Sequence, residues 1–104
     1  MAAYNVVRFR VRPGKDKEFL AAHVDGKANW PGLSHGVIFR TDDHSYCLIG
    51  EWVDLAALAA ARPQMIATLD SFRHTLEPHP GGQGVTDAVS GPVVLDLKSG
   101  AAHK

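Results

Sequence analysis

Residues 4–12, YNVVRFRVR, decide the fold, because apolar and basic side chains alternate strictly from Val7 to Arg12. One face of the segment carries Val7, Phe9 and Val11, and the other carries Arg8, Arg10 and Arg12. A period of two residues predicts a β-strand whose two faces differ in character. Pro13 and Gly14 end the strand, since this dipeptide marks a turn.

A helix and two strands are predicted to follow this turn. Residues 15–30, KDKEFLAAHVDGKANW, place four side chains at helical spacing: Phe19, Leu20, His23 and Val24. Pro31 ends this helix, because the residue before a proline avoids the helical region. Residues 33–40, LSHGVIFR, and 45–52, SYCLIGEW, predict strands, and the polar TDDH between them is typical of a hairpin turn.

A second helical stretch is predicted over residues 55–77, with Asp54 as its N-cap. One helical face is traced by Leu55, Leu58, Arg62, Met65, Ile66, Leu69, Phe72 and Leu76. Pro63 is expected to divide the stretch into a short helix ending near Ala61 and a longer helix with the proline in its first turn.

The remainder of the chain predicts a loop, a strand and a tail. Residues 78–92 contain three prolines and four glycines, a composition typical of a loop. Residues 93–98, VVLDLK, predict a last strand, and residues 99–104 a frayed tail. The order β-α-β-β-α-β over residues 1–104 predicts a single ferredoxin-like α+β domain, with a four-stranded antiparallel sheet and both helices on one face.

The other face of that sheet must meet water or a partner. It is expected to carry Ile38, Cys47, Ile49 and Val94 among the charged residues Arg8, Arg10 and Glu51. A face of mixed apolar and charged character suits a homodimer in which two sheets close on each other. The charged residues are interpreted as a salt-bridge network across strands or across the dimer, with an anion site as the alternative.

Composition excludes several classes of partner. Lys and Arg together number 11, as do Asp and Glu, so the formal net charge is zero and no basic footprint for nucleic acid is present. No apolar run reaches the 18 or so residues that a membrane-spanning helix requires. One cysteine, Cys47, forms no disulfide within the chain, as expected of a cytoplasmic protein, and its mid-strand place is typical of a small buried side chain.

Three segments resemble the antibiotic biosynthesis monooxygenase-like family of the dimeric α+β barrel superfamily. They are VVRFRVRPGKDKEFL, WPGLSHGVIFR and YCLIGEWVDLAAL, and the ARPQMIATL proline break fits as well. The resemblance spans residues 4–98. It implies a dimeric α+β barrel with a ligand pocket between the sheet and the helices of each subunit. Family activities include cofactor-free oxygenation of aromatic substrates, quinol oxidation and oxidative haem breakdown, and the fold alone does not choose among them.

Haem breakdown is disfavoured by the resemblance itself. The haem-degrading relatives use an Asn on the first strand, a Trp on the second helix and a His further along that helix. The corresponding positions here are Val7, Ala61 and, at most, His74. Cofactor-free relatives rely on Asn, Trp and Arg around the pocket, for which Asn5, Trp52 and Arg62 are the counterparts by residue type.

Histidines are the candidate acid–base residues. In residues 72–82, FRHTLEPHPGG, Pro78 separates His74 from His79, so a metal site is not expected and His79 is a loop residue. His74 is either a helix-end histidine that favours the helix dipole or a pocket base. His35 and His23 lie among apolar residues of a strand and a helix, and each is either a hydrogen-bonded core residue or a catalytic base.

The leading hypothesis is a cofactor-independent monooxygenase that acts on a small hydrophobic or aromatic substrate without metal or flavin. A pocket base (His35, His23 or His74) would deprotonate the substrate, and the anion would react with oxygen. Trp52, Arg62, Trp30 and Phe72 are the predicted ligand contacts. The alternatives are a non-catalytic ligand-binding dimer of the same architecture and, third, a haem-handling protein.

Overall fold

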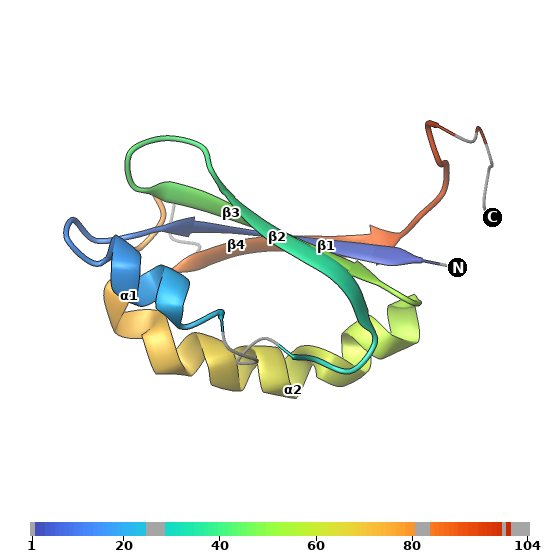
Figure 1. The fold of residues 1–104 in the computed structure, drawn as a ribbon, viewed down its shortest axis with the longest axis horizontal. Coiled ribbons are helices and arrows are strands. Elements are labelled where there is room, and N and C mark those ends of the chain that lie inside the picture. Colours follow the sequence, from blue (N-terminus) through green and yellow to red (C-terminus); the bar gives the residue numbers. More distant parts are fainter. Residues whose placement is uncertain (1, 25–28, 81–83, 99, 101–104) are drawn as a thin grey trace.

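The computed structural model describes residues 2–24, 29–80, 84–98 and 100, and within them the predicted β-α-β-β-α-β order is confirmed. The strands are β1 (Ala3–Arg10), β2 (Leu33–Arg40), β3 (Ser45–Trp52) and β4 (Thr86–Pro92). The helices are α1 (Asp16–Ala21) and α2 (Leu55–Phe72), and a short 3-10 turn, η1 (Arg73–Thr75), follows α2. All strand pairs are antiparallel in the order β2-β3-β1-β4, and both helices lie on one face of the sheet (Figure 1). The fold is ferredoxin-like α+β.

The core lies between the sheet and the two helices, where the alternation in β1 requires it. Phe9 and Val11 are buried on the helix side, whereas Arg8 and Arg10 lie on the other side. Phe9 meets Phe19 of α1 and Phe72 of α2 edge-to-face, with ring centroids 5.1 and 5.8 Å away. Such aromatic pairs contribute about 0.5–1.5 kcal/mol beyond the area that they bury.

Both predicted helices have different bounds from those expected. The first ends at Ala21, so the predicted helix over residues 15–30 was too long, although residues 25–28 lie outside the described part. The second runs unbroken through Pro63, so the predicted division was wrong. Pro63 and Ala59 are both exposed, so the Ala59 carbonyl that loses its helical partner faces solvent, where water can satisfy it. An alanine-rich first half also favours a continuous helix.

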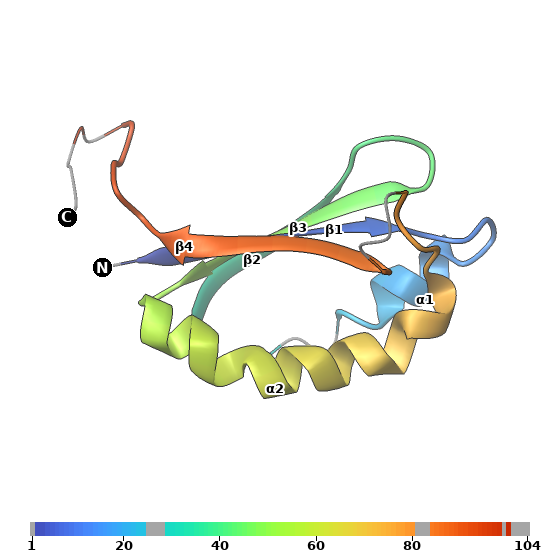
Figure 2. The same cartoon turned by 180° about the vertical axis from the view of Figure 1, so that it is seen from behind.

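The last strand is not VVLDLK but the segment before it, TDAVSGP, which was predicted to be a loop. Its pairing with β1 runs from Thr86 opposite Phe9 to Pro92 opposite Ala3. Glycine and proline are tolerated here because β4 is an edge strand, one side of which needs no ladder partner. Val93 still donates from its amide to the carbonyl of Ala2 at 2.9 Å; the chain after it turns away from β1 (Figure 2), and Leu97 is 90% exposed. The prediction that Val94 belongs to a strand of this sheet was therefore wrong; of the predicted tail, the structure describes only Gly100.

A bulge in β2 reverses the predicted faces of that strand. The register passes from Leu33 opposite Trp52 to His35 opposite Glu51, which leaves Ser34 as an extra residue. Beyond the bulge Ile38 packs against the core, so its predicted place on the uncovered face was wrong. His35, Val37 and Phe39 face away from the helices instead, because a shift of one residue moves every following side chain to the opposite face.

The face of the sheet opposite the helices stays uncovered, as predicted (Figure 1). One row across its four strands consists of Val37, Ile49, Val6 and Val89. Arg8 pairs with Asp87 of β4 at 3.9 Å, whereas the sequence had suggested Glu51 as a partner. Within the described residues, no helix has the length and apolar character needed to cross a membrane.

Candidate functional site

A cavity of about 370 Å³ lies between the sheet and α2. Its walls come from β1, β4 and α2, together with Leu48 of β3, His23 and Trp30. Aromatic and aliphatic side chains dominate the walls, including Phe9, Phe72, Leu58, Met65 and Leu69. The volume lies near the lower end of the range of about 300–1,000 Å³ that is usual for small-molecule sites. The cavity is therefore suited to a small hydrophobic ligand.

His23 enters this cavity from the turn that follows α1. Its Nδ1 lies 2.9 Å from the carbonyl oxygen of Phe19, and a carbonyl can only accept, so Nδ1 carries the proton. The second nitrogen, Nε2, then holds the lone pair of the neutral ring. The ring lies against Phe72 and Phe19, with centroids 4.6 and 5.1 Å away. Burial among these rings lowers the pKa of His23 from its usual value, which favours the neutral form that can accept a proton.

Asn5 of β1 presents an amide to the same cavity. Its side chain is 6% exposed, and its Oδ1 accepts a hydrogen bond of 2.8 Å from the indole N–H of Trp52. Because an indole nitrogen only donates, this bond fixes the amide with Nδ2 on the other side. Nδ2 approaches the sulfur of Met65 at 4.0 Å, and a thioether is a weak acceptor. The amide therefore retains donor capacity for an oxygen atom of a ligand.

Gly50 of β3 makes room for this pair. A Cβ atom at that position would lie 2.5 Å from Oδ1 of Asn5 and 3.0 Å from Nε1 of Trp52. Both distances are too short for the present geometry, so any side chain at Gly50 would displace the hydrogen bond.

Two tryptophans support the inner wall. Trp52 is fully buried and stacks on Trp30, with ring centroids 6.2 Å apart and planes inclined by 14°. Trp30 lines the cavity and donates from Nε1 to the hydroxyl of Thr68 at 3.3 Å. Trp52 holds Asn5 rather than lining the cavity itself.

Arg62 of α2 supplies the positive charge at the cavity. Its guanidinium donates to the hydroxyl of Ser90 in β4 at 3.2 Å, so it bridges the helix and the edge strand. The residue is exposed, and the bond to Ser90 is neutral on the acceptor side, which leaves the charge available to an anionic ligand.

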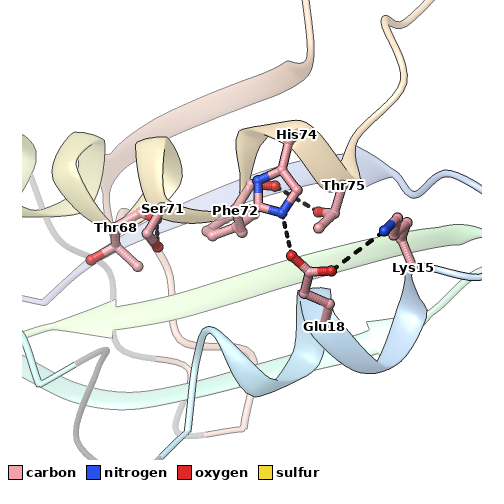
Figure 3. Close-up of polar contacts among 7 residues, drawn as sticks. All are labelled: Lys15, Glu18, Thr68, Ser71, Phe72, His74 and Thr75. Atoms are coloured by element: carbon pink, nitrogen blue, oxygen red, sulfur yellow. Dashed lines mark hydrogen bonds and ion pairs between the residues drawn. The ribbon is translucent and has the colours of Figure 1, made fainter.

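His74 lies outside the cavity, in η1. Its Nε2 pairs with the carboxylate of Glu18 in α1, and Lys15 approaches the same carboxylate at 3.7 Å (Figure 3). The hydrogen bond from His74 lowers the pKa of Glu18. His74 therefore ties η1 to α1 and is not placed to ligate a haem iron in the cavity.

His35 lies on the uncovered face of the sheet, beyond the bulge in β2. Among the three candidate histidines, His23 alone lines the cavity, and no pair of them meets there. His79 lies in the segment after η1, where its Nε2 donates to the carbonyl of Arg8 at 2.9 Å. Among the described residues, no group of three His, Cys, Asp or Glu side chains is arranged to hold a metal ion.

Of the four residues predicted to contact a ligand, three line the cavity and one does not. Arg62, Trp30 and Phe72 line the cavity, and Trp52 stands behind Asn5. Residue-type reasoning had singled out Asn5, which has the same parity as Phe9 along β1. Two contacts were not predicted: that of Met65 with the amide of Asn5 and that of Thr68 with the indole of Trp30. Nothing in the spacing of α2 distinguishes these two positions from ordinary core positions.

Solved structures share this fold. SnoaB, a cofactor-independent oxygenase from Streptomyces nogalater, is 20% identical over 92% of this chain and 96% of its own, with a TM-score of 0.67. A putative antibiotic biosynthesis monooxygenase from Chloroflexus aurantiacus is 15% identical (90% and 94% coverage, TM-score 0.67). NE2512, a protein of unknown function from Nitrosomonas europaea, is 17% identical (91% of each chain, TM-score 0.70). No protein-family model and no curated protein matches the sequence. The chain thus has the fold of the antibiotic biosynthesis monooxygenase-like proteins.

Proposed function

We propose that this protein is a cofactor-independent monooxygenase that oxidises a small aromatic substrate with an acidic C–H group. The observation that carries the proposal is the 2.9 Å contact between Nδ1 of His23 and the Phe19 carbonyl, from which we infer a neutral imidazole with its lone pair on Nε2 in an aromatic cavity. The shared fold with a cofactor-independent oxygenase agrees with this chemistry without deciding it.

In the proposed reaction His23 takes a proton from a ring methylene that is flanked by a phenol or a keto group. The negative charge moves onto the substrate oxygen, where Nδ2 of Asn5 and the guanidinium of Arg62 donate hydrogen bonds to it. Donors that are fixed before the charge develops, in a site that excludes water, stabilise such an anion strongly.

The electron-rich carbanion then reacts directly with molecular oxygen. One oxygen atom stays on the carbon as a new carbonyl group, and the other leaves as water with the two hydrogens of the former methylene. The substrate supplies all the electrons that reduce both oxygen atoms, so the balance needs no metal, flavin or other reductant. The protein acts as base, as oxyanion donor and as an apolar container.

The proposed enzyme is a cytoplasmic homodimer that buries the uncovered face of its sheet. The row of Val37, Ile49, Val6 and Val89 is apolar across all four strands, and an uncovered apolar sheet face favours association. The free thiol of Cys47 lies buried on the same face, which suits a reducing compartment.

Oxygen uptake tests the proposal directly. The metal-free protein is mixed with anthrone-like and phenolic compounds in an oxygen electrode, and product carbonyl is followed by mass spectrometry. His23→Gln is expected to lower the rate by about 10²–10⁴-fold, as loss of a general base does. His74→Gln removes an imidazole outside the cavity and should leave the rate unchanged. Absence of substrate-dependent uptake across the whole panel contradicts the proposal, and tight binding without turnover indicates a non-catalytic binding protein.

A further inference from the structure

A second cavity, of about 530 Å³, lies beside the first, between β2, β3 and the segment around α1. His23, Trp30 and Leu48 line both cavities, so the two abut at these three side chains. The proposed oxygenase reaction uses only the first cavity, which leaves the second without a role.

The two cavities differ in chemistry. The first contains polar groups from Asn5, Arg62 and Ser90 between aromatic rings. The second is walled mainly by aliphatic side chains: Leu20, Val24, Leu33 and Ile38. Apart from the shared His23 and Trp30, its polar side chain among the described residues is that of Asn29. A ring bearing an oxygen fits the first cavity, and a hydrocarbon chain fits the second.

A cross-strand pair of glycines, Gly36 opposite Gly50, forms part of the floor of the second cavity. Gly50 is required by the bond between Asn5 and Trp52, but Gly36 has no such constraint. A Cβ atom at Gly36 would meet its nearest neighbour, Cδ2 of Leu33, at an ordinary 3.6 Å. Glycine weakens a strand interior, so its effect at this position is to leave a hollow rather than to relieve strain.

We propose that one amphipathic ligand occupies both cavities, with an oxygen-bearing aromatic ring in the first and a hydrocarbon tail in the second. The ligand class is thus an alkyl-substituted phenol or a ketone derived from one. The ring lies beside His23 and Asn5, and the tail passes Trp30 and lies over Gly36. The position of the ring rests on the proposed function, whereas the site of the tail rests on the glycine pair and the aliphatic walls.

Binding of para-alkylphenols, from methyl to octyl, tests this inference. Trp30 lines both cavities, so tryptophan fluorescence reports binding, and calorimetry gives the affinity independently. Each methylene group that enters the second cavity should tighten binding about fourfold in the wild-type protein. Gly36→Val fills the floor of the second cavity, so lengthening the chain should bring no gain, while the affinity for the methyl compound stays the same.

Gly91→Val is the matched control, because it makes the same change in β4. A Cβ atom at Gly91 meets nothing within 4 Å, and Gly91 lines neither cavity. It should keep the wild-type dependence on chain length. If Gly36→Val does not fold, Val24→Phe narrows the second cavity from a half-exposed position and should give the same loss.

The inference is overturned if affinity stops rising beyond the shortest chains in the wild-type protein, or if Gly36→Val and Val24→Phe keep the wild-type dependence. Because the readout is binding, it is separate from the proposed reaction. Tight binding of the long phenols, together with no oxygen uptake on any compound that carries the acidic ring methylene, contradicts the oxygenase alone. Turnover of compounds with that methylene, together with phenol binding that does not depend on chain length, contradicts the tail site alone.

Discussion

Replacing Gly50 by alanine is predicted to damage the site and the fold together. The new Cβ atom would lie 2.5 Å from Oδ1 of Asn5, 3.0 Å from Nε1 of Trp52 and 3.3 Å from Cδ1 of Leu33. Trp52 is fully buried and stacks on Trp30, so its indole is held in place, whereas Asn5 borders the first cavity and has room to turn. Asn5 must therefore rotate, which breaks the hydrogen bond from Trp52.

Two costs add up in this variant. Overpacking a core by one methyl group costs about 1–3 kcal/mol. Leaving a buried donor or acceptor without its partner costs about 1–3 kcal/mol as well. A loss of about 3 kcal/mol in unfolding free energy is thus expected, a large part of the roughly 5–15 kcal/mol by which small domains are stable. For a chain near this size, it lowers the melting temperature by roughly 12–24 °C.

Urea denaturation followed by tryptophan fluorescence and circular dichroism measures this loss. Gly36→Ala is the control, because it places the same methyl group on the cross-strand partner, where the nearest atom is 3.6 Å away. Replacing a strand glycine where there is room should leave stability unchanged or raise it by up to about 1 kcal/mol. Equal stability of Gly50→Ala and Gly36→Ala would refute the claim that Gly50 exists to accommodate the pair of Asn5 and Trp52.

Three further predictions concern other parts of the molecule. Burial lowers the pKa of His23 below the value of about 6.5 that it has in the unfolded chain, so the unfolded state binds the proton more readily. The free energy of unfolding should therefore fall as the pH drops through 6.5 towards the folded pKa. His23→Gln should remove that part of the pH dependence, as measured by urea titration at several pH values. Asp54 caps α2 by accepting from the Ala57 amide at 2.7 Å, so Asp54→Ala should cost about 1 kcal/mol in chemical denaturation, and no loss would contradict the cap. Ile49→Lys places a charge in the apolar row of the uncovered face and should convert the proposed dimer to a monomer in sedimentation velocity; a variant dimer as stable as the wild type would rule out that interface.

The sequence predicted the order of the elements and the faces of β1 correctly, but it failed where a bulge or long-range pairing overrides the local pattern. The alternation in β1 specified its buried face correctly, because Phe9 and Val11 needed cover and the arginines did not. The last strand was misplaced because VVLDLK is richer in β-forming residues than TDAVSGP. Segment 86–92 is a strand because it lies along β1 and satisfies the backbone groups of that strand, a long-range effect that local composition does not reveal.

The candidate site was predicted by residue type but not by position. Three histidines stood near apolar residues, and alternation in β2 had placed His35 beside Leu33. Nothing in the sequence chose among them, because the choice depends on the turn after α1 and on how η1 lies against α1. The bond from Trp52 to Asn5 joins residues 47 positions apart, so only the sheet register brings them together.

The extra residue in β2 affects both the proposed base and the proposed ligand. Without the bulge, the alternation from Leu33 would turn His35 towards the helices and Gly36 away from them. With it, His35 leaves the helix side, and Gly36 comes opposite Gly50 beneath the second cavity. The same shift of one residue therefore removes one candidate base and opens the hollow that we assign to the tail of the ligand. The proposed catalytic residue and the proposed ligand length therefore both depend on the register of a single edge strand.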